Sequence, residues 1–202
     1  MNSELTLYES TNENSKKVLF LGYSTEQTSL ISELSKAGCQ VWHTQNRIES
    51  TAGFDLVVSF GYRYIIEKKI IESSAAPIIN LHISYLPWNR GAHPNFWCFY
   101  DETPCGVSIH LIDEGIDTGP IIYQKLVSFN KNESTFTKTY IKLISEIESL
   151  FVSNISNLIQ LDFTAKVQKG NGSYHSTSEL PKDFKGWESD INIEIARLKA
   201  LK

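Results

Sequence analysis

Three polar residues, Asn80, His82 and Asp117, form the pattern in this chain that could do chemistry. Residues 77–83 are apolar and rich in β-branched side chains, which predicts a buried strand. Because strand side chains alternate between two faces, Asn80 and His82 project to the same side. At the carboxyl end of a strand in an open α/β sheet, ligands bind. There an amide and an imidazole N–H can stabilise an oxyanion, and a carboxylate can accept a proton.

Each of these residues also has a plainer structural explanation when it is taken singly. An Asn near a strand end is often a turn former, and a lone His is often a hydrogen-bonded core residue. Asp117 lies in Ile-Asp-Thr-Gly-Pro, a sequence that is common in turns. The ordered combination, with a Pro- and Gly-rich loop over residues 87–94 between the two parts, favours the functional interpretation.

This ordered set resembles the folate-dependent formyltransferases, which carry Asn-x-His on a strand, a Pro- and Gly-rich loop, and a later Asp in a similar segment. The resemblance runs from about residue 17 to about residue 129 and is strong over residues 79–124. Residues 86–91 and 95–97 look most like the members that formylate nucleotide-linked amino sugars. The resemblance implies an N-formyltransferase that moves a formyl group from its co-substrate, 10-formyltetrahydrofolate, to the amine of a nucleotide-linked amino sugar.

The resemblance also implies roles for individual residues. Asn80 and His82 would polarise the formyl carbonyl, and Asp117 would accept the proton of the amine directly or through a water; no metal is needed. An Arg in the following loop suits a pyrophosphate, and a Trp offers a stacking face. His110 supports the site or acts in it, and both readings stay open. The implied folate contacts are Tyr62, Arg63, Tyr64, Ile66, Ile112, Asp113 and Gly115. The implied acceptor contacts are Trp88, Asn89, Arg90, His93 and His110.

The chain departs from other members of that family in ways that bear on the substrate. The turn after the first strand reads Gly22-Tyr23-Ser24-Thr25, not the phosphate-binding Gly- and Ser-rich loop of the members that act on glycinamide ribonucleotide. The segment 164–202 is too short for the additional β-barrel of the members that act on initiator methionyl-tRNA. Both substrates are therefore disfavoured.

Other functions stay open as alternatives. A formyltetrahydrofolate hydrolase could use the same three groups, and would release formate without an amine. Transfer to another small amine, such as glycinamide ribonucleotide, also fits the motif. A third alternative is a binding protein without catalysis, and a lack of folate binding in calorimetry would favour it.

Composition indicates the class of molecule. A chain of 202 residues with 41% hydrophobic and 21% charged residues is expected to fold around a sizeable core. A net charge of −4 and no basic block longer than two residues disfavour a nucleic-acid partner. No apolar run approaches the ~20 residues of a membrane span, and the first ten residues lack the features of a secretory signal. We therefore expect a cytoplasmic protein with no membrane partner and three reduced thiols, Cys39, Cys98 and Cys105.

Hydrophobic periodicity predicts an α/β fold that positions these groups: a Rossmann-like, doubly wound, mostly parallel sheet with a long C-terminal helix. Strands are expected over 17–23, 39–43, 54–60, 78–83, 107–112 and 121–127. Helices are expected over 30–37, 67–72, 95–100 and 134–161.

The predicted catalytic domain covers residues 17–163. An N-terminal arm, residues 1–16, precedes it, and residues 5–8 of this arm could add an edge strand. The C-terminal segment 164–202 is expected to begin with a hairpin around Lys169-Gly170-Asn171-Gly172. Tyr174 and Trp187 in this segment suit either acceptor stacking or a homodimer contact, and the sequence does not choose between them.

Overall fold

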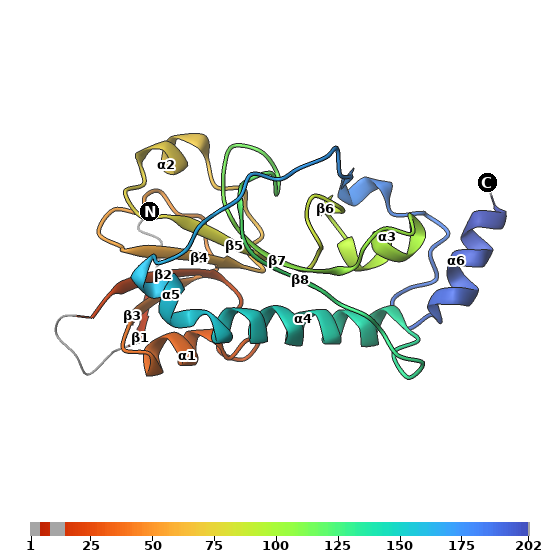
Figure 1. Cartoon of the computed structure of the whole chain (residues 1–202), viewed down its shortest axis with the longest axis horizontal. Coiled ribbons are helices and arrows are strands. Elements are labelled where there is room, and N and C mark those ends of the chain that lie inside the picture. The colour runs from red at the N-terminus through yellow and green to blue at the C-terminus, as the bar shows by residue number, and fades with distance from the viewer. Residues whose placement is uncertain (1–4, 9–14, 202) are drawn as a thin grey trace.

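The computed structural model describes residues 5–8 and 15–201. Within these residues the chain forms a seven-stranded sheet in the order β1-β3-β2-β4-β5-β7-β8, covered by helices on both faces (Figure 1). The inner strands β3, β2, β4 and β5 are parallel, and β1, β7 and β8 pair antiparallel with their neighbours. The predicted doubly wound, mostly parallel α/β fold is therefore confirmed. The strands are β1 (Thr6–Tyr8), β2 (Lys17–Gly22), β3 (Gln40–Thr44), β4 (Leu56–Phe60), β5 (Ile78–His82), β7 (Gly106–Leu111) and β8 (Ile121–Leu126).

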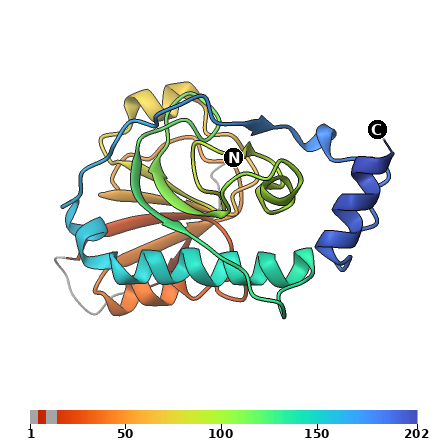
Figure 2. The ribbon, with the colours of Figure 1, turned by 45° about the vertical axis from the view of Figure 1, so that its right-hand side comes forward.

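Alternating apolar residues of the central strands build a core on each face of the sheet. Val18 and Phe20 of β2 belong to a cluster that includes residues of α1 (Leu30–Lys36) and α4 (Phe136–Ser153). Leu19 and Leu21 belong to the opposite cluster, with Ile70 of α2 (Lys68–Ser73). Because both faces of β2 are covered, the strand is a nearly continuous apolar run. In Figures 1 and 2, α4 runs the length of one face beside α1, and α2 lies on the other.

The edge strand expected in the N-terminal arm is present. β1 pairs antiparallel with β3, and Leu7 lies opposite Trp42. Residues 1–4 and 9–14 of the predicted arm lie outside the described residues.

The predicted single helix over residues 134–161 is wrong in one respect, because it is broken at Asn154. α4 ends at Ser153, and a second helix, α5 (Ile155–Gln160), follows. The Asn154 side-chain amide donates to the Leu150 carbonyl at 2.8 Å, so a side chain competes for a backbone acceptor at the break. The long helix is thus two elements, and only α4 spans the sheet.

The predicted hairpin in the C-terminal segment is also wrong. Its two flanks pair with separate parts of the preceding chain: Lys166 bridges to Ile121, and β9 (Tyr174–His175) pairs in parallel with β6 (Arg90–Gly91). Strand edges on the domain therefore compete successfully with local pairing. The boundary near residue 163 and the homodimer contact stay predictions.

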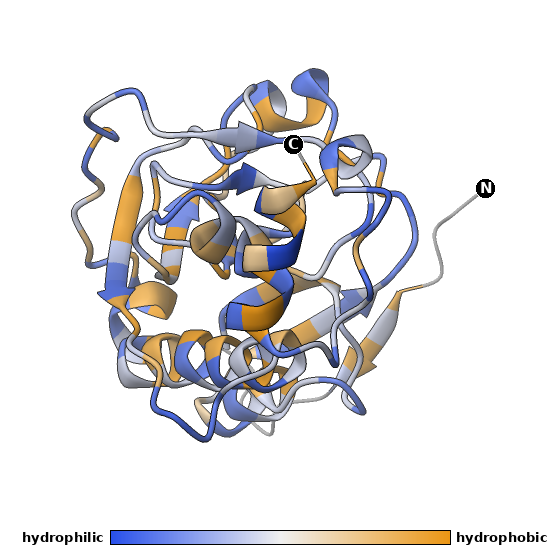
Figure 3. Ribbon diagram, turned by 90° about the vertical axis from the view of Figure 1, so that its right-hand side faces the viewer, coloured by the Kyte–Doolittle hydropathy of each residue, from blue (hydrophilic) through white to orange (hydrophobic). Residues whose placement is uncertain are grey.

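The end of the chain forms a helix, α6 (Ile191–Ala200), that was not predicted. Asp190 caps it by accepting from the Ile193 N–H at 3.1 Å. Its buried residues Ile191 and Leu198 pack with Phe96 of α3 (Pro94–Tyr100) in a third apolar cluster. Figure 3 views the molecule from this end and shows hydrophobic and hydrophilic residues along α6. The helix therefore anchors the C-terminal segment to the domain.

The expectation of three reduced thiols is wrong for two of them. Cys98 and Cys105 form a disulfide, with Cα atoms 5.3 Å apart. The turn between α3 and β7, closed by the Thr103 N–H on the Cys98 carbonyl at 3.1 Å, brings them together. Within the described residues Cys39 is free and buried, and burial raises the pKa of its thiol to about 11.

Among the residues that the structure describes, no helix is long and apolar enough to cross a membrane.

The packing of α4 on the sheet gives a test of the core. Phe151 is fully buried, so Phe151→Ala is expected to lower the free energy of unfolding by about 3–5 kcal/mol. Urea unfolding followed by circular dichroism measures this loss. Its matched control is Val152→Ala on the exposed side of the same helix, with an expected change below about 0.5 kcal/mol. Equal losses for the two variants would contradict the placement of α4.

Candidate active site

The register between β5 and β7 builds the centre of the site. Asn80 on β5 lies directly opposite His110 on β7. Opposed residues of an antiparallel pair point to the same face, so the two side chains meet. The Asn80 Nδ2 and His110 Nε2 atoms are 3.2 Å apart. His82, two residues further along β5, points to that face as well, as the sequence predicted.

Asp117 is the residue on which these side chains converge. Its Oδ1 accepts from Asn80 Nδ2 at 3.2 Å and lies 3.4 Å from His110 Nε2. Its Oδ2 lies 3.6 Å from His82 Nε2 and accepts from the Gly91 N–H at 2.8 Å. The three predicted catalytic residues, distant in sequence, therefore occupy one site, and His110 joins them.

The Asp117 carboxyl is held as an anion. Burial by itself raises its pKa, since only 13% of the side chain is exposed. The neighbouring His82 and His110 and the Gly91 N–H have the opposite effect, and on balance they lower the pKa well below its ordinary value. Its backbone φ of 52° lies in the left-handed region, which Asp enters more readily than most residues. The loop thus turns sharply to present a carboxylate to two imidazoles.

The hydrogen bonds of His110 select the tautomer of its ring. Its Nδ1 lies 2.8 Å from the Leu111 carbonyl, an acceptor, so Nδ1 carries a proton. In the neutral ring Nε2 then accepts from the Asn80 amide, and in the charged ring it donates to Asp117. His110 is therefore part of the polar cluster and lies on a strand, as the sequence predicted.

A cavity of about 200 Å³ opens on one side of the cluster and reaches Asn80, His110 and Asp117. It is flanked by the segment after β4 and by the loop that precedes Asp117. Of the predicted folate contacts it includes Tyr62, Tyr64, Ile66, Ile112, Asp113 and Gly115. Arg63 instead lines a neighbouring cavity of about 320 Å³, beside Gly22 and Tyr64.

On the other side, a cavity of about 360 Å³ is lined by Asn80, His82 and Asp117 together with Tyr23 and Tyr140. The two tyrosine hydroxyls are 2.9 Å apart. Burial, reinforced by the Tyr23 hydroxyl, raises the pKa of Tyr140. The Tyr140 phenol therefore stays neutral, and both hydroxyls can donate or accept hydrogen bonds beside the cluster.

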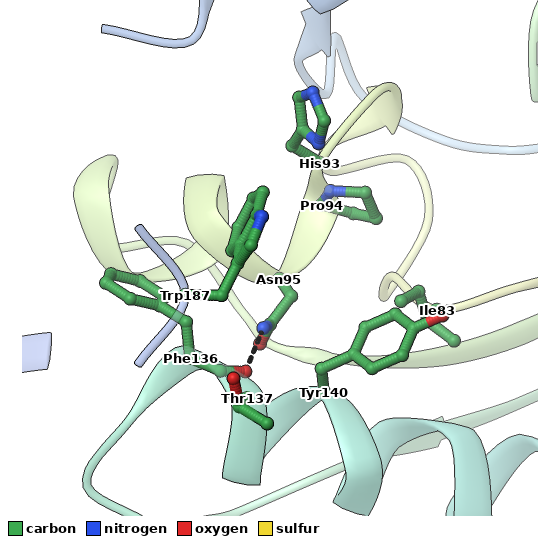
Figure 4. A pocket seen from close by; sticks show the side chains of 8 residues that line it. All are labelled: Ile83, His93, Pro94, Asn95, Phe136, Thr137, Tyr140 and Trp187. Atoms are coloured by element: carbon green, nitrogen blue, oxygen red, sulfur yellow. Dashed lines mark hydrogen bonds between the residues drawn. The ribbon is translucent and has the colours of Figure 1, made fainter. Parts of the chain in front are cut away.

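This second space continues into an apolar cavity of about 410 Å³, which shares Ile83, Pro94 and Tyr140 with it. Figure 4 shows Trp187 and Tyr140 on opposite sides of Asn95, with His93 above them. The rings of His93 and Trp187 have centroids 5.4 Å apart. Burial lowers the pKa of His93, which favours a neutral ring. His93, one of the predicted acceptor contacts, thus lines this apolar cavity.

The remaining predicted acceptor contacts are placed differently. Asn89 is fully buried, and its side chain bonds to Thr103 and Ser173. Arg90 donates to the Gln168 side chain, and Trp88, with 36% of its area exposed, lines none of the cavities above. Asn89 therefore braces the loop, and neither it nor Arg90 is presented to a cavity. A charged or aromatic loop residue gives no sequence signal of the direction in which it points.

Comparison with known proteins gives the family. A formyl transferase family model matches residues 20–155, more than half of the chain, and the chain belongs to this family. The methionyl-tRNA formyltransferase of Thermodesulfovibrio yellowstonii is 37% identical over 131 residues, which cover 64% of this chain and 41% of that protein. The methionyl-tRNA formyltransferase of Wolbachia pipientis is 33% identical over 146 residues, which cover 72% of this chain and 47% of that protein. The chain thus spans about half the length of the curated relatives it matches.

A solved structure resembles the chain over nearly its full length. The formyltransferase PseJ of Anoxybacillus kamchatkensis, in complex with UDP-4,6-dideoxy-4-formamido-L-AltNAc and tetrahydrofolate, is 37% identical. The TM-score is 0.79, and the match covers 87% of this chain and 96% of PseJ. An N-formyltransferase of Helicobacter canadensis, in complex with folinic acid and dTDP-3-aminofucose, shares the fold at 21% identity and a TM-score of 0.68, over 90% and 78% of the two chains.

The electrostatics of the site predict a pH dependence of stability. The lowered folded-state pKa of Asp117 means that its ionised form stabilises the fold. This contribution is present above the unfolded pKa, about 4, and is lost as the pH falls toward the lowered folded value. Asp117→Asn is therefore expected to be less stable than wild type at pH 7, by a margin that shrinks below about pH 4. Urea unfolding between pH 7 and pH 3 measures the difference in the free energy of unfolding between the two proteins. A difference that does not change with pH would contradict the assignment of Asp117 as a stabilising anion.

Proposed function

We propose that this protein is an N-formyltransferase that moves a formyl group from 10-formyltetrahydrofolate to the amine of a nucleotide-linked amino sugar. The observation that carries the proposal is the position of the Asn80–His82–Asp117 cluster at the junction of two cavities. A group-transfer enzyme with two substrates needs such a junction, because donor and acceptor must meet at one set of catalytic groups. The similarity to PseJ over 96% of its length supports the same activity.

The proposed reaction begins when the amine nitrogen attacks the formyl carbon. A tetrahedral intermediate forms, and its oxyanion accepts hydrogen bonds from Asn80 Nδ2 and the His82 ring. Asp117 receives the amine proton, directly or through a water. The bond between the formyl carbon and the folate nitrogen then breaks, and a proton returns to that nitrogen. Because His110 and the Gly91 N–H also hold the carboxylate, the groups are oriented before the substrates arrive.

The folate would occupy the cavity between Tyr62 and Ile112. Ile66 is buried in its wall, while Ile65 and Ile116 are exposed at 77% and 44% around it. An apolar, partly open slot of this kind suits a flat ring system with a polar tail that extends into solvent. Asp113 and the backbone of Gly115 supply polar groups at its far wall.

The acceptor would enter from the opposite side, through the cavity lined by Tyr140 and Trp187. Aromatic rings suit the apolar face of a deoxysugar or a nucleotide base. A hydrolase uses water, which needs no apolar cavity of about 410 Å³ next to the catalytic groups. This cavity therefore supports transfer to an organic amine over hydrolysis.

A nucleotide sugar is favoured over tRNA although the curated relatives are methionyl-tRNA formyltransferases. The net charge of −4, with no basic block, does not suit a phosphate backbone. PseJ, whose solved complex holds a nucleotide sugar, also matches this chain at 37% identity with a TM-score of 0.79.

The catalytic roles are tested by Asn80→Ala and Asp117→Asn. Loss of one oxyanion donor is expected to lower kcat about 10²–10³-fold, and loss of the proton acceptor about 10²–10⁴-fold. The assay follows formylation of a UDP-linked 4-amino-4,6-dideoxy sugar with 10-formyltetrahydrofolate, with circular dichroism to verify folding. Full activity in either folded variant refutes its role, and formate release by wild type without an amine supports the hydrolase.

The two substrate cavities are tested by a pair of aromatic substitutions. Trp187→Ala is expected to raise the KM of the nucleotide sugar about tenfold and leave that of the folate unchanged, because stacking energy of about 1.4 kcal/mol is lost. Tyr64→Ala, on the side of the proposed folate cavity, is expected to do the reverse, and each variant serves as the control for the other. Steady-state kinetics with one substrate varied at a time measure both values. If both variants changed the KM of the same substrate, the proposed placement of the folate and the nucleotide sugar in separate cavities would be wrong.

A further inference from the structure

Gln168 of the C-terminal segment contacts the loop that carries Asp117. Its Nε2 donates to the Asp117 carbonyl and to the Gly119 carbonyl, each at 2.8 Å. A primary amide has two N–H donors, and both are used on this one loop.

The other end of the same side chain contacts the loop after β5. Gln168 Oε1 accepts from Arg90 Nε at 3.1 Å and from Arg90 Nη2 at 2.8 Å. The planar guanidinium thus forms a two-pronged contact, which fixes direction as well as distance. The Gln168 amide therefore uses both of its N–H donors and its carbonyl oxygen to link two loops.

The contacts close a ring around Asp117. Arg90 is followed by Gly91, whose N–H donates to Asp117 Oδ2 at 2.8 Å. Asp117 is therefore held at its backbone carbonyl through Gln168 and at its carboxylate through Gly91, and both contacts lead to β6. A left-handed backbone at a non-glycine residue persists only where its surroundings determine it, and this ring does so.

The C-terminal segment is itself fastened on both sides of Gln168. On one side, the N–H and carbonyl of Lys166 bond to Ile121, each at 2.8 Å. On the other, the Ser173 carbonyl accepts from the Arg90 N–H at 3.0 Å and the His175 carbonyl from the Ala92 N–H at 2.8 Å. Gln168 is therefore placed by a strap, residues 166–175, that crosses from β8 to β6.

We propose that Gln168, with Arg90, is a positioning residue that holds the Asp117 carboxylate at the angle and distance required for proton acceptance. This inference rests on the proposed function and assigns the C-terminal segment a part in catalysis. It also gives Arg90 the role of holding Gln168 of the strap, in place of the acceptor contact expected from the sequence.

The test compares Gln168→Met, which keeps the length of the side chain and removes its amide, with Val167→Ala as the matched control. Val167 neighbours Gln168 in the strap and is 76% exposed. Gln168→Met is expected to lower kcat about 10- to 100-fold with the KM of both substrates within about threefold, because misplacement by about 1 Å disrupts proton transfer. Val167→Ala is expected to behave as wild type.

Hydrogen exchange of backbone amides, followed by NMR, gives a readout that does not depend on the substrate. Exchange at the Gly91 N–H, which binds Asp117, is expected to accelerate at least about tenfold in Gln168→Met. Ala92, which binds the His175 carbonyl in the same loop, is expected to keep its rate. Equal acceleration at both amides would mean that the strap has simply detached, and would overturn the positioning role.

Two further outcomes separate this inference from the proposed function. If wild type formylates no amino sugar, the proposed function fails, and the exchange at Gly91 still decides the role of Gln168. If wild type is active and Gln168→Met keeps kcat within about twofold and an unchanged Gly91 exchange rate, the positioning role is wrong. Arg90→Lys removes the two hydrogen bonds from the guanidinium to Gln168. A lower kcat in this variant supports the positioning role, whereas a higher KM for the acceptor alone would mean that Arg90 contacts the acceptor directly.

Discussion

A largely buried carboxylate is the constraint on which the rest of this structure depends. Asp117 is 13% exposed and ionised, and a charge with so little contact with water is tolerated only if it is paired and hydrogen-bonded. Its partners come from separate elements: Asn80 and His82 from β5, His110 from β7, and Gly91 from β6. The strand register, the loop conformation and the docking of the C-terminal segment therefore all have to agree at one point.

Under the proposed function, this arrangement lets one set of groups serve two substrates. Asn80 and Asp117 line the cavities on both sides of the cluster, so a carbonyl carbon placed between them can be reached from either direction. The two sides differ in character. One is a slot between a loop and a strand end, and the other continues into an apolar cavity lined by Trp187 from the C-terminal segment. In the proposed reaction, donor and acceptor would therefore be distinguished by shape and polarity before any chemistry occurs.

The C-terminal segment supports the site at several points instead of forming an independent hairpin. Lys166 joins it to β8, β9 joins it to β6, and α6 packs against α3. Within it, Gln168 contacts the Asp117 loop and Trp187 lines the apolar cavity. Variation in this segment would therefore alter both the position of the Asp117 carboxylate and the shape of this cavity while the sheet stays the same.

The sequence by itself determined the α/β class and the strand carrying Asn80 and His82, because strand periodicity is a local property, and the resemblance to a known motif predicted that Asp117 would join them. Tertiary structure decided the rest. The inward turn of Asn89 and Arg90 and the pairing of residues 166 and 174–175 depend on partners distant in sequence. The helix break at Asn154 and the disulfide between Cys98 and Cys105 were not predicted either, although their partners are close in sequence. A loop side chain has no fixed periodicity, so its direction follows from the hydrogen-bonding groups and apolar surfaces that the folded chain places beside it.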